Sequence, residues 1–264
     1  MKVENIRVSN FENAIRGMRN PMNSWNKMDS AFGIGSEEWT EADWSVAEAW
    51  VMKDGLSIDS EGYDEAIEKY DAWLIKNGVI HRDENSNCFE YAFIGPNDMD
   101  LAQRLIKAGP EHCKFLRQIF VSMDITAPLY WWKEFDTYKI GTTANSTSTM
   151  HKLASKPITI DCFEADDFVN ICYPNERDDF IKTELIPYLE FLRLKYLETK
   201  DNKYWKELVR WLPNGWLQTR TWTGSYANLR NMRHQRKGHK LTEWHFICDT
   251  IDTLPYAEEF INCK

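Results

Sequence analysis

The sequence predicts an α+β fold with a mixed core and long helices. Two patterns carry this prediction: apolar residues recur every three or four positions over several long segments, while a few short segments alternate between apolar and polar residues. The first pattern is typical of helices that bury one face, and the second of half-buried strands. The chain has 264 residues, 43% of them hydrophobic, which is enough to enclose a sizeable core. We therefore expect a single domain over residues 1–264.

The chain is predicted to begin with a strand and a short helix. Residues 3–8 alternate as a strand does. Ser9 followed by Glu12 then predicts a capping box for a helix that continues through Met18.

The following region is predicted to be a loop and two helices. Residues 19–39 are rich in turn formers, and the Gly33-Ile34-Gly35 segment favours a flexible turn over a phosphate-binding loop because no lysine or helix start follows it. One helix is capped by Thr40, and the second ends near Gly78. We expect residues 19–95 to form a helical insertion or annex of the single domain.

The middle of the chain is predicted to alternate between helices and one strand. A helix begins at Asn97 and ends at Gly109, and residues 119–125 alternate as a strand. Pro128 fits the first turn of a helix that reaches about Tyr138.

A small-polar tract, residues 141–149, resembles a plain linker. A long helix then starts at Asp178 and is kinked or restarted at Pro187. The segment ends with a helix over residues 204–211 and a short strand over residues 219–223.

The C-terminal region places an arginine on a stripe that is otherwise apolar. Arg236 lies four residues after Met232, on the helical face predicted to be buried, and Gly238 interrupts the helix. A guanidinium keeps its charge, so on an inward face it needs a partner. That partner is either a ligand or an internal ion pair, and a snorkelling side chain is the third alternative. The apolar members of the stripe are Leu229, Met232, Trp244, Cys248 and Ile251.

Composition excludes several classes of protein. A net charge of -9 and the lack of a Lys/Arg block argue against nucleic-acid binding. No apolar run approaches the ~20 residues of a membrane span. The six cysteines form no CxxC pair, and the histidines lack metal-ligand spacing. These features predict a cytoplasmic protein with reduced thiols, no membrane partner and no metal site.

Three segments in order carry a family resemblance. They are Gly109-Pro-Glu-His112, seven residues before Ile119; Ala127-Pro128 at the start of a helix; and Leu212-Pro213, followed by a helix that reaches Arg236. In their order and spacing, over residues 95–255, they resemble the flavin-dependent thymidylate synthases.

The resemblance implies a set of site residues. His112, Asn231 and Tyr138 would contact the flavin, while Arg236 and Lys139 would bind the nucleotide phosphate. Thr147 and Thr149 would line the nucleotide loop. If the loop holds one inserted residue, the matching set becomes Asn145, Ser148 and His151. Arg210 lies one residue away from another arginine position of the family.

The chain also departs from the family pattern. Where the family has Arg-His-Arg, this chain has Thr137-Tyr138-Lys139, so one point charge replaces two planar guanidinium groups. Glu134 stands in place of a substrate-contacting glutamine and would repel a phosphate. Losing these arginines would weaken nucleotide affinity and the activation of the pyrimidine.

The resemblance implies a function as well as a fold. An active member would methylate dUMP to dTMP with methylenetetrahydrofolate, reduced FAD and NADPH, as a homotetramer whose flavin sites lie between subunits. Two alternatives remain: a relative that binds nucleotide without catalysis, and a structural or interaction protein in which Arg236 pairs with an internal carboxylate.

Overall fold

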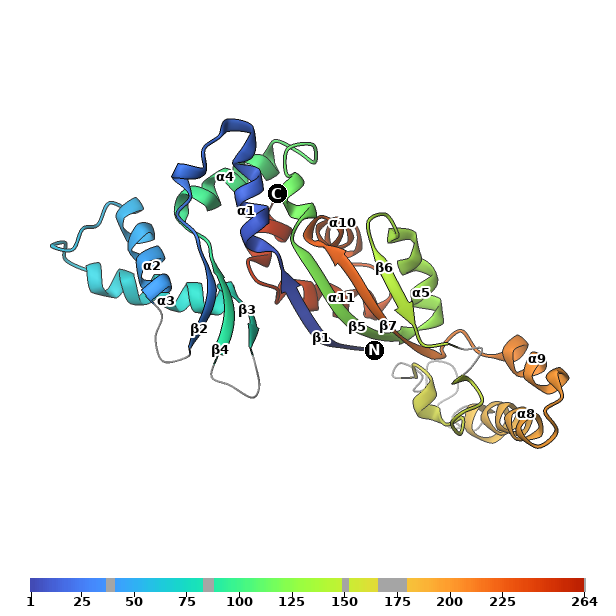
Figure 1. The fold of residues 1–264 in the computed structure, drawn as a ribbon. Coiled ribbons are helices and arrows are strands. Elements are labelled where there is room, and N and C mark those ends of the chain that lie inside the picture. The colour runs from blue at the N-terminus through green and yellow to red at the C-terminus, as the bar shows by residue number, and fades with distance from the viewer. Residues whose placement is uncertain (37–40, 83–87, 149–151, 166–179, 264) are drawn as a thin grey trace. The chain divides into compact units, whose positions relative to one another are not determined.

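The computed structural model describes residues 1–36, 41–82, 88–148, 152–165 and 180–263. Helices and strands are mixed along the chain, as predicted for an α+β fold (Figure 1). The chain divides into two compact units. Unit 1 comprises residues 1–4, 124–139 and 144–222, and unit 2 comprises residues 5–123, 140–143 and 223–264.

A four-stranded sheet has the order β1-β5-β7-β6 (Figure 1). Its strands are β1 (Lys2–Ser9), β5 (Phe120–Pro128), β6 (Thr143–Ser146) and β7 (Leu217–Ser225). The predicted strands at residues 3–8, 119–125 and 219–223 are confirmed. β6 lies inside the small-polar tract of residues 141–149, for which a strand was not predicted.

Strands β5 and β7 are antiparallel and share a polar seam. The Ser122 and Thr223 hydroxyls are 2.6 Å apart, and those of Thr126 and Thr219 are 2.7 Å apart, so the residue numbers run in opposite directions. Met123 and Ile125, which alternate with the seam residues on β5, point to the other face and are buried. This alternation explains why the strand was predictable.

In unit 2, residues 31–93 contain a second sheet as well as helices. Helices α2 (Glu41–Lys53) and α3 (Tyr63–Gly78) pack with an antiparallel sheet of order β2-β4-β3. Its strands are β2 (Ala31–Ser36), β3 (Val79–Arg82) and β4 (Cys88–Phe93), with the register Ala31↔Phe93 at one end of the β2-β4 pair and Ser36↔Cys88 at the other. The shared core consists of Val46, Ala47, Val51, Ile67, Leu74, Phe89 and Phe93.

The sheet corrects the prediction that residues 33–35 form a flexible turn. Gly33 and Gly35 are paired residues of β2. A Cβ on Gly33 would lie 3.0 Å from the Tyr91 hydroxyl oxygen, so a glycine lets this strand pack closely against the tyrosine. The predicted helix start at Thr40 lies outside the described residues.

Helix α1 (Phe11–Met18) forms where predicted but is not capped as predicted. Its N-cap is Asn10, with a φ of 70° and no side-chain capping bond. Ser9 remains the last residue of β1, so the chain turns one residue later than a Ser9–Glu12 capping box requires. The helix is held instead by its buried face of Phe11, Ala14, Ile15 and Met18.

A buried ion pair anchors the segment after α1 to helix α4 (Pro96–Lys107). Arg19 Nε lies 2.5 Å from Asp98 Oδ1, and both side chains are almost completely buried. Asp98 Oδ2 also accepts hydrogen bonds from the Ser30 amide (3.1 Å) and hydroxyl (2.7 Å). Asp29 Oδ2 accepts a hydrogen bond from the Asn97 amide at 2.8 Å. This network satisfies the start of α4, which begins one residue before the predicted Asn97.

The C-terminal part of unit 2 consists of helices α10 (Tyr226–Arg236) and α11 (Thr242–Asp252). A capping box between Ser225 and Asn228 starts α10. The chain turns at Gly238, whose φ is +82°, as predicted. The five apolar stripe residues are buried, also as predicted.

Unit 1 adds helices to its part of the four-stranded sheet. Helix α5 (Leu129–Phe135) follows β5, and α8 (Ile186–Thr199) packs against α9 (Asn202–Trp211). Leu153, Ile158, Leu189, Leu192 and Leu208 form the core of that pair. Pro187 lies in the first turn of α8 after a π-helix, so the predicted restart is confirmed. The predicted start at Asp178 lies outside the described residues.

Short helical turns complete the described chain. They are η1 (Asn20–Met22), η2 (Trp25–Lys27), η3 (Lys114–Arg117), η4 (Asp136–Tyr138), η5 (Ile160–Cys162), η7 (Phe180–Leu185) and η8 (Glu258–Asn262). Within the described residues, no helix has the length and hydropathy needed to cross a bilayer.

Candidate functional site

Unit 2 contains a pocket of about 850 Å³ between helix α10 and the turn that follows α4. Gly109, Pro110 and Cys113 line it from the turn, while Asn231 and His234 line it from α10. Ile106, Leu116 and Ile140 add apolar surface. A mostly apolar concavity with a few polar groups is the usual form of a small-molecule site.

The polar groups of this pocket are mainly cationic or amide donors. Arg117 forms no ion pair or hydrogen bond within the described part of the chain. Arg230 is fixed because its Nη1 donates to the Ile261 carbonyl at 2.7 Å. Asn228 Nδ2 donates to the Ile140 carbonyl at 2.9 Å. The pocket lining includes no carboxylate side chain, so it suits an anionic ligand.

His234 is a titratable group of the pocket. Partial removal from water, and then the charge of nearby Arg230, lower its pKa. The ring is therefore neutral at pH 7 and can either donate or accept a hydrogen bond. An anion bound beside it would favour the protonated ring.

Two of the predicted flavin-contacting residues lie at or beside this pocket. Asn231 is exposed on α10 and lines the pocket, with its Oδ1 accepting from Gln235 Nε2 at 2.8 Å. His112 is exposed in the turn between the lining residues Pro110 and Cys113, and its amide donates to the Gly109 carbonyl at 2.9 Å. The structure therefore brings the Gly109–His112 segment and α10 together.

Arg236, the last residue of α10, is half-buried and lies over an indole. Its guanidinium carbon is 4.7 Å from the centre of the Trp244 ring, and Trp244 is completely buried. The prediction of an inward-facing arginine is therefore partly right, because one face of the cation packs on an aromatic ring. Arg236 is not among the residues that line the pocket.

Arg233 differs from its prediction. Its position off the Met232–Arg236 stripe predicts a solvent-facing side chain. Instead it forms a two-pronged ion pair with Asp252 of α11, at 2.8 and 2.7 Å, and its side chain is only 11% exposed. A surface position on one helix becomes a contact once the next helix packs beside it.

In unit 1, the altered signature follows helix α5. Tyr138 ends η4 and is half-buried, with its ring 6.5 Å from that of Phe135. Lys139 comes next and is exposed. Below them, Trp131 and Trp132 are buried, with their ring centres 4.9 Å apart. The signature position therefore rests on a rigid aromatic base.

The predicted nucleotide loop is partly described. Asn145 is exposed in β6, Thr147 is exposed just after β6, and Ser148 is half-buried. The Thr147 amide donates to the Thr219 carbonyl at 2.9 Å, so the loop extends the edge of the sheet at β7. Thr149 and His151 lie outside the described residues.

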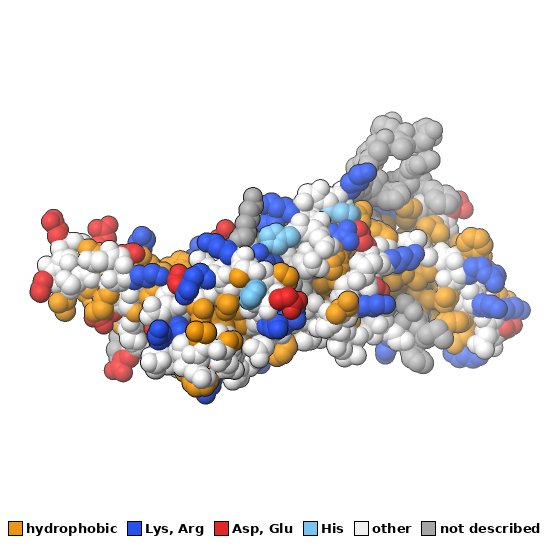
Figure 2. Space-filling view, turned by 90° about the horizontal axis from the view of Figure 1, so that it is seen from above, with side chains coloured by type: hydrophobic (Ala, Val, Ile, Leu, Met, Phe, Trp, Pro, Cys, Tyr) orange, Lys and Arg blue, Asp and Glu red, His pale blue; other side chains and the backbone are white. Residues whose placement is uncertain are grey.

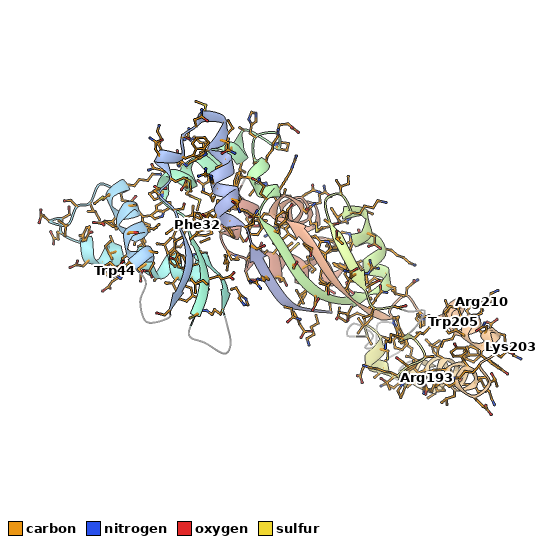
Figure 3. All side chains as sticks on the ribbon, in the orientation of Figure 1. Phe32, Trp44, Arg193, Lys203, Trp205 and Arg210 are labelled. Atoms are coloured by element: carbon orange, nitrogen blue, oxygen red, sulfur yellow. The ribbon has the colours of Figure 1, made fainter. Side chains whose placement is uncertain are left out.

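Arg210 stands apart from this loop. It lies on α9 (Figure 3), where its guanidinium is paired with Glu207 one turn earlier. Surface pairs of this kind contribute little and leave few donors for a ligand.

The sequence analysis missed Arg220. This residue of β7 stacks on Trp132 at 4.1 Å and donates to Asp136 at 2.7 Å. A signal was present, because alternation along the strand places Arg220 on the face of Gln218 and Trp222, which are both buried. Among the described residues, no group of three or more His, Cys, Asp or Glu side chains could hold a metal ion.

Comparison with solved structures identifies the fold. The chain matches two crystal structures of the flavin-dependent thymidylate synthase ThyX from Helicobacter pylori, both complexed with FAD and dUMP. The TM-scores are 0.56 and 0.57, the identities 13% and 14%, and each match covers 100% of this chain and 99% of the other.

The chain has the fold of the flavin-dependent thymidylate synthases. This confirms the fold that the three sequence segments predicted. No family model matches the sequence, and no curated protein matches it. The likeness is therefore one of fold, at a sequence identity too low for overall similarity to reveal it.

Proposed function

We propose that this protein binds FAD in the pocket of unit 2 and that it also binds a uridine nucleotide. The observation that supports this most is the convergence of Gly109–His112 and Asn231 at one pocket. These segments lie far apart in the sequence, and the family resemblance assigns a residue of each to the flavin. The fold of the whole chain matches an enzyme crystallised with FAD and dUMP.

The pocket suits FAD in size and chemistry. Its volume of about 850 Å³ falls within the range of small-molecule sites. Ile106, Leu116 and Ile140 offer apolar surface to a flat ring system, while Arg117 and Arg230 offer charge to a diphosphate. Asn231 adds an amide, which can donate to or accept from the edge of a flavin ring.

The nucleotide is assigned to a second set of side chains. The family resemblance assigns the phosphate to Arg236 and Lys139, and it assigns the nucleotide loop to Thr147 and Thr149. The shifted loop register replaces these threonines with Asn145 and Ser148. The resemblance also assigns Tyr138 to the flavin, and Arg210 contributes only if its pair with Glu207 opens.

The proposed reaction is the methylation of dUMP to dTMP. Methylenetetrahydrofolate donates the carbon and NADPH is the reductant. FAD supplies the hydride transfer when bound. The residues of this chain bind and orient the ligands: the cations hold the anionic groups, and the buried Trp131–Trp132 pair keeps the signature turn rigid.

A second candidate is a relative that binds the same ligands without catalysis. The Thr137-Tyr138-Lys139 segment favours it, because one exposed lysine replaces two arginines. Such a protein would bind dUMP weakly and form no dTMP.

We also propose a homotetramer in the cytoplasm. Helix α8 buries one face against α9, yet Tyr188, Phe191 and Leu194 are 45%, 50% and 52% exposed on its other sides. Figure 2 shows hydrophobic side chains on the surface at the end of the view that holds these helices. Exposed aromatic and aliphatic groups of this kind favour contacts between subunits.

Nucleotide binding and turnover separate these candidates. We expect protein reconstituted with FAD to bind dUMP in calorimetry and to form dTMP when methylenetetrahydrofolate and NADPH are added. Binding without dTMP formation would favour the non-catalytic relative. Protein that binds neither FAD nor dUMP would contradict the proposal and favour a structural role.

A further inference from the structure

Arg220 is a charged residue on the inner face of strand β7. Its side chain is 16% exposed, and its neighbours on the same face, Gln218 and Trp222, are buried. Because a guanidinium cannot be deprotonated in a protein, this position must supply partners for a permanent charge. Arg220 belongs to unit 1, as do all the residues that contact it below.

The structure engages the guanidinium in three ways. Its face lies 4.1 Å from the centre of the Trp132 ring. Its Nη1 donates to Asp136 Oδ1 at 2.7 Å, and its Nε donates to Gln218 Oε1 at 3.0 Å. The planar fork of an arginine can do this, whereas the single ammonium group of a lysine cannot stack and bridge two acceptors at once.

Gln218 connects Arg220 to the loop after β6 through hydrogen bonds. Since its Oε1 accepts from Arg220, its amide group is oriented with Nε2 towards the loop. That Nε2 donates to the Thr147 carbonyl at 3.0 Å. The Thr147 amide in turn donates to the Thr219 carbonyl at 2.9 Å. Both backbone groups of Thr147 are therefore held by β7.

Asp136 connects Arg220 to the altered signature, Thr137-Tyr138-Lys139. It is the first residue of η4, whose last residue, Tyr138, precedes Lys139. The ion pair with Arg220 therefore fixes the turn from which Tyr138 and Lys139 extend. One side chain links the two segments that sequence resemblance assigned to the nucleotide.

We propose that Arg220 is a positioning residue for the nucleotide site: it holds the Thr147 loop and the Asp136–Lys139 turn in a fixed relation. The proposal rests on the proposed function, because it assigns those two segments to nucleotide binding. Arg220 itself does not bind the phosphate, since its stacking and its hydrogen bonds are made within the protein. By holding these segments, Arg220 reduces the entropy lost when Lys139 and Thr147 become ordered around the nucleotide.

The test is dUMP binding by calorimetry on the FAD-loaded protein, with three methionine variants and the conservative variant Arg220→Lys. Arg220→Met removes the charge and both hydrogen bonds. Gln218→Met leaves the pair with Asp136 and the stacking on Trp132 but breaks the link to Thr147. Arg193→Met is the matched control, because Arg193 is a buried arginine of unit 1, paired with Glu190 on α8 (Figure 3).

We expect Arg220→Met to weaken dUMP binding about tenfold, as for one lost charge-assisted hydrogen bond. Gln218→Met should weaken it by a smaller factor. Arg193→Met should change only the melting temperature. FAD affinity should be unchanged in all three, and Arg220→Lys should restore part of the loss.

Two results would overturn the role of Arg220. One is a folded Arg220→Met protein that binds dUMP as the wild type does. The other, decisive if Arg220→Met fails to fold, is a Gln218→Met protein with unaltered dUMP affinity. If the wild type binds no dUMP at all, the proposed function fails, and the role of Arg220 fails with it.

Discussion

The pocket of unit 2 and the altered signature of unit 1 differ in whether their arginines form ion pairs. In the pocket, Arg117 has no ion-pair partner among the described residues, and no carboxylate lines the cavity. In unit 1, Arg220 is paired with Asp136 and Arg210 with Glu207. A cation left without a counter-ion favours an anionic ligand, whereas a paired cation favours a fixed local structure. The pocket of unit 2 thus has the chemistry of a binding site more clearly than the proposed nucleotide segment does.

Reversing a charge in the pocket should have the largest effect. Arg117→Glu replaces a free cation with an anion beside the proposed diphosphate, so we expect FAD affinity to fall about 100-fold, a loss of ~3 kcal/mol. Flavin fluorescence titration measures this. Lys206→Glu, the same reversal on an exposed residue of α9, is the control and should bind FAD as the wild type does. Equal affinities for all three proteins would place FAD elsewhere.

Removing the half-buried arginine of α10 should have the next largest effect. Arg236→Ala should weaken dUMP binding by ~2 kcal/mol, about 30-fold, through the loss of one charge-assisted contact. Its stacking on Trp244 is worth less, ~0.5–1 kcal/mol, so the melting temperature should fall only slightly. Calorimetry and thermal melts together decide the matter. A collapse of stability with unaltered dUMP affinity would make Arg236 a structural residue.

Restoring a guanidinium to the signature should have a smaller effect of the opposite sign. Lys139 is exposed, so Lys139→Arg can be accommodated without repacking, and its planar fork can form two hydrogen bonds with a phosphate. We expect dUMP affinity to rise about threefold to tenfold. Lys133→Arg on α5 controls for added arginine in general. If both variants bind alike, Lys139 does not occupy the old signature position.

The smallest predicted effect is on the pH dependence of stability, which we expect to have opposite signs in the two units. Burial, and then the neighbouring carboxyl of Asp43, raise the pKa of Asp71 in unit 2 to about 6, from an ordinary value of 3.8. The folded state therefore binds this proton more tightly than the unfolded state does. The resulting stability is fully present below about pH 4 and is lost as the pH rises through 6.

Asp71→Asn should abolish this dependence. We expect the variant to unfold about 2 °C higher than the wild type at pH 7.5, a gain of ~1 kcal/mol after allowance for solvent screening, and to match it at pH 4. In unit 1 the sign is opposite, because the hydrogen bond from Arg193 lowers the pKa of Glu190. Glu190→Gln should therefore lower stability at pH 7.5. The expected difference between the units would be contradicted if the Glu190→Gln variant were more stable than the wild type at pH 7.5. It would also be contradicted if the Asp71→Asn variant were less stable than the wild type at that pH.

Most helices and three strands were predictable because their periodicity extends over enough residues to be recognised. The sheet of unit 2 was not. Its strands span six, four and six residues, one contains two glycines, and the pairing of β2 with β4 joins segments far apart in sequence. Short strands of this kind are specified by packing between α3 and β4 more than by local preference.

The site was predictable only in part, for a related reason. The family resemblance singled out Asn231 and the Gly109–His112 turn, and the structure brings them together. The partner of Arg236 could not be found, since Trp244 reaches it only after the chain turns at Gly238. Arg220 could have been found: it alternates with two buried residues of β7, the same pattern that drew attention to Arg236 on its helix.

The central claim is that the pocket of unit 2 binds a flavin, and the visible absorbance spectrum tests it most directly. Purified protein is incubated with FAD, freed of the excess by gel filtration, and compared with the Arg117→Glu variant treated in the same way. The account predicts a retained flavin spectrum near one FAD per subunit for the wild type and its loss in the variant. A wild-type protein that stays colourless after incubation would contradict it.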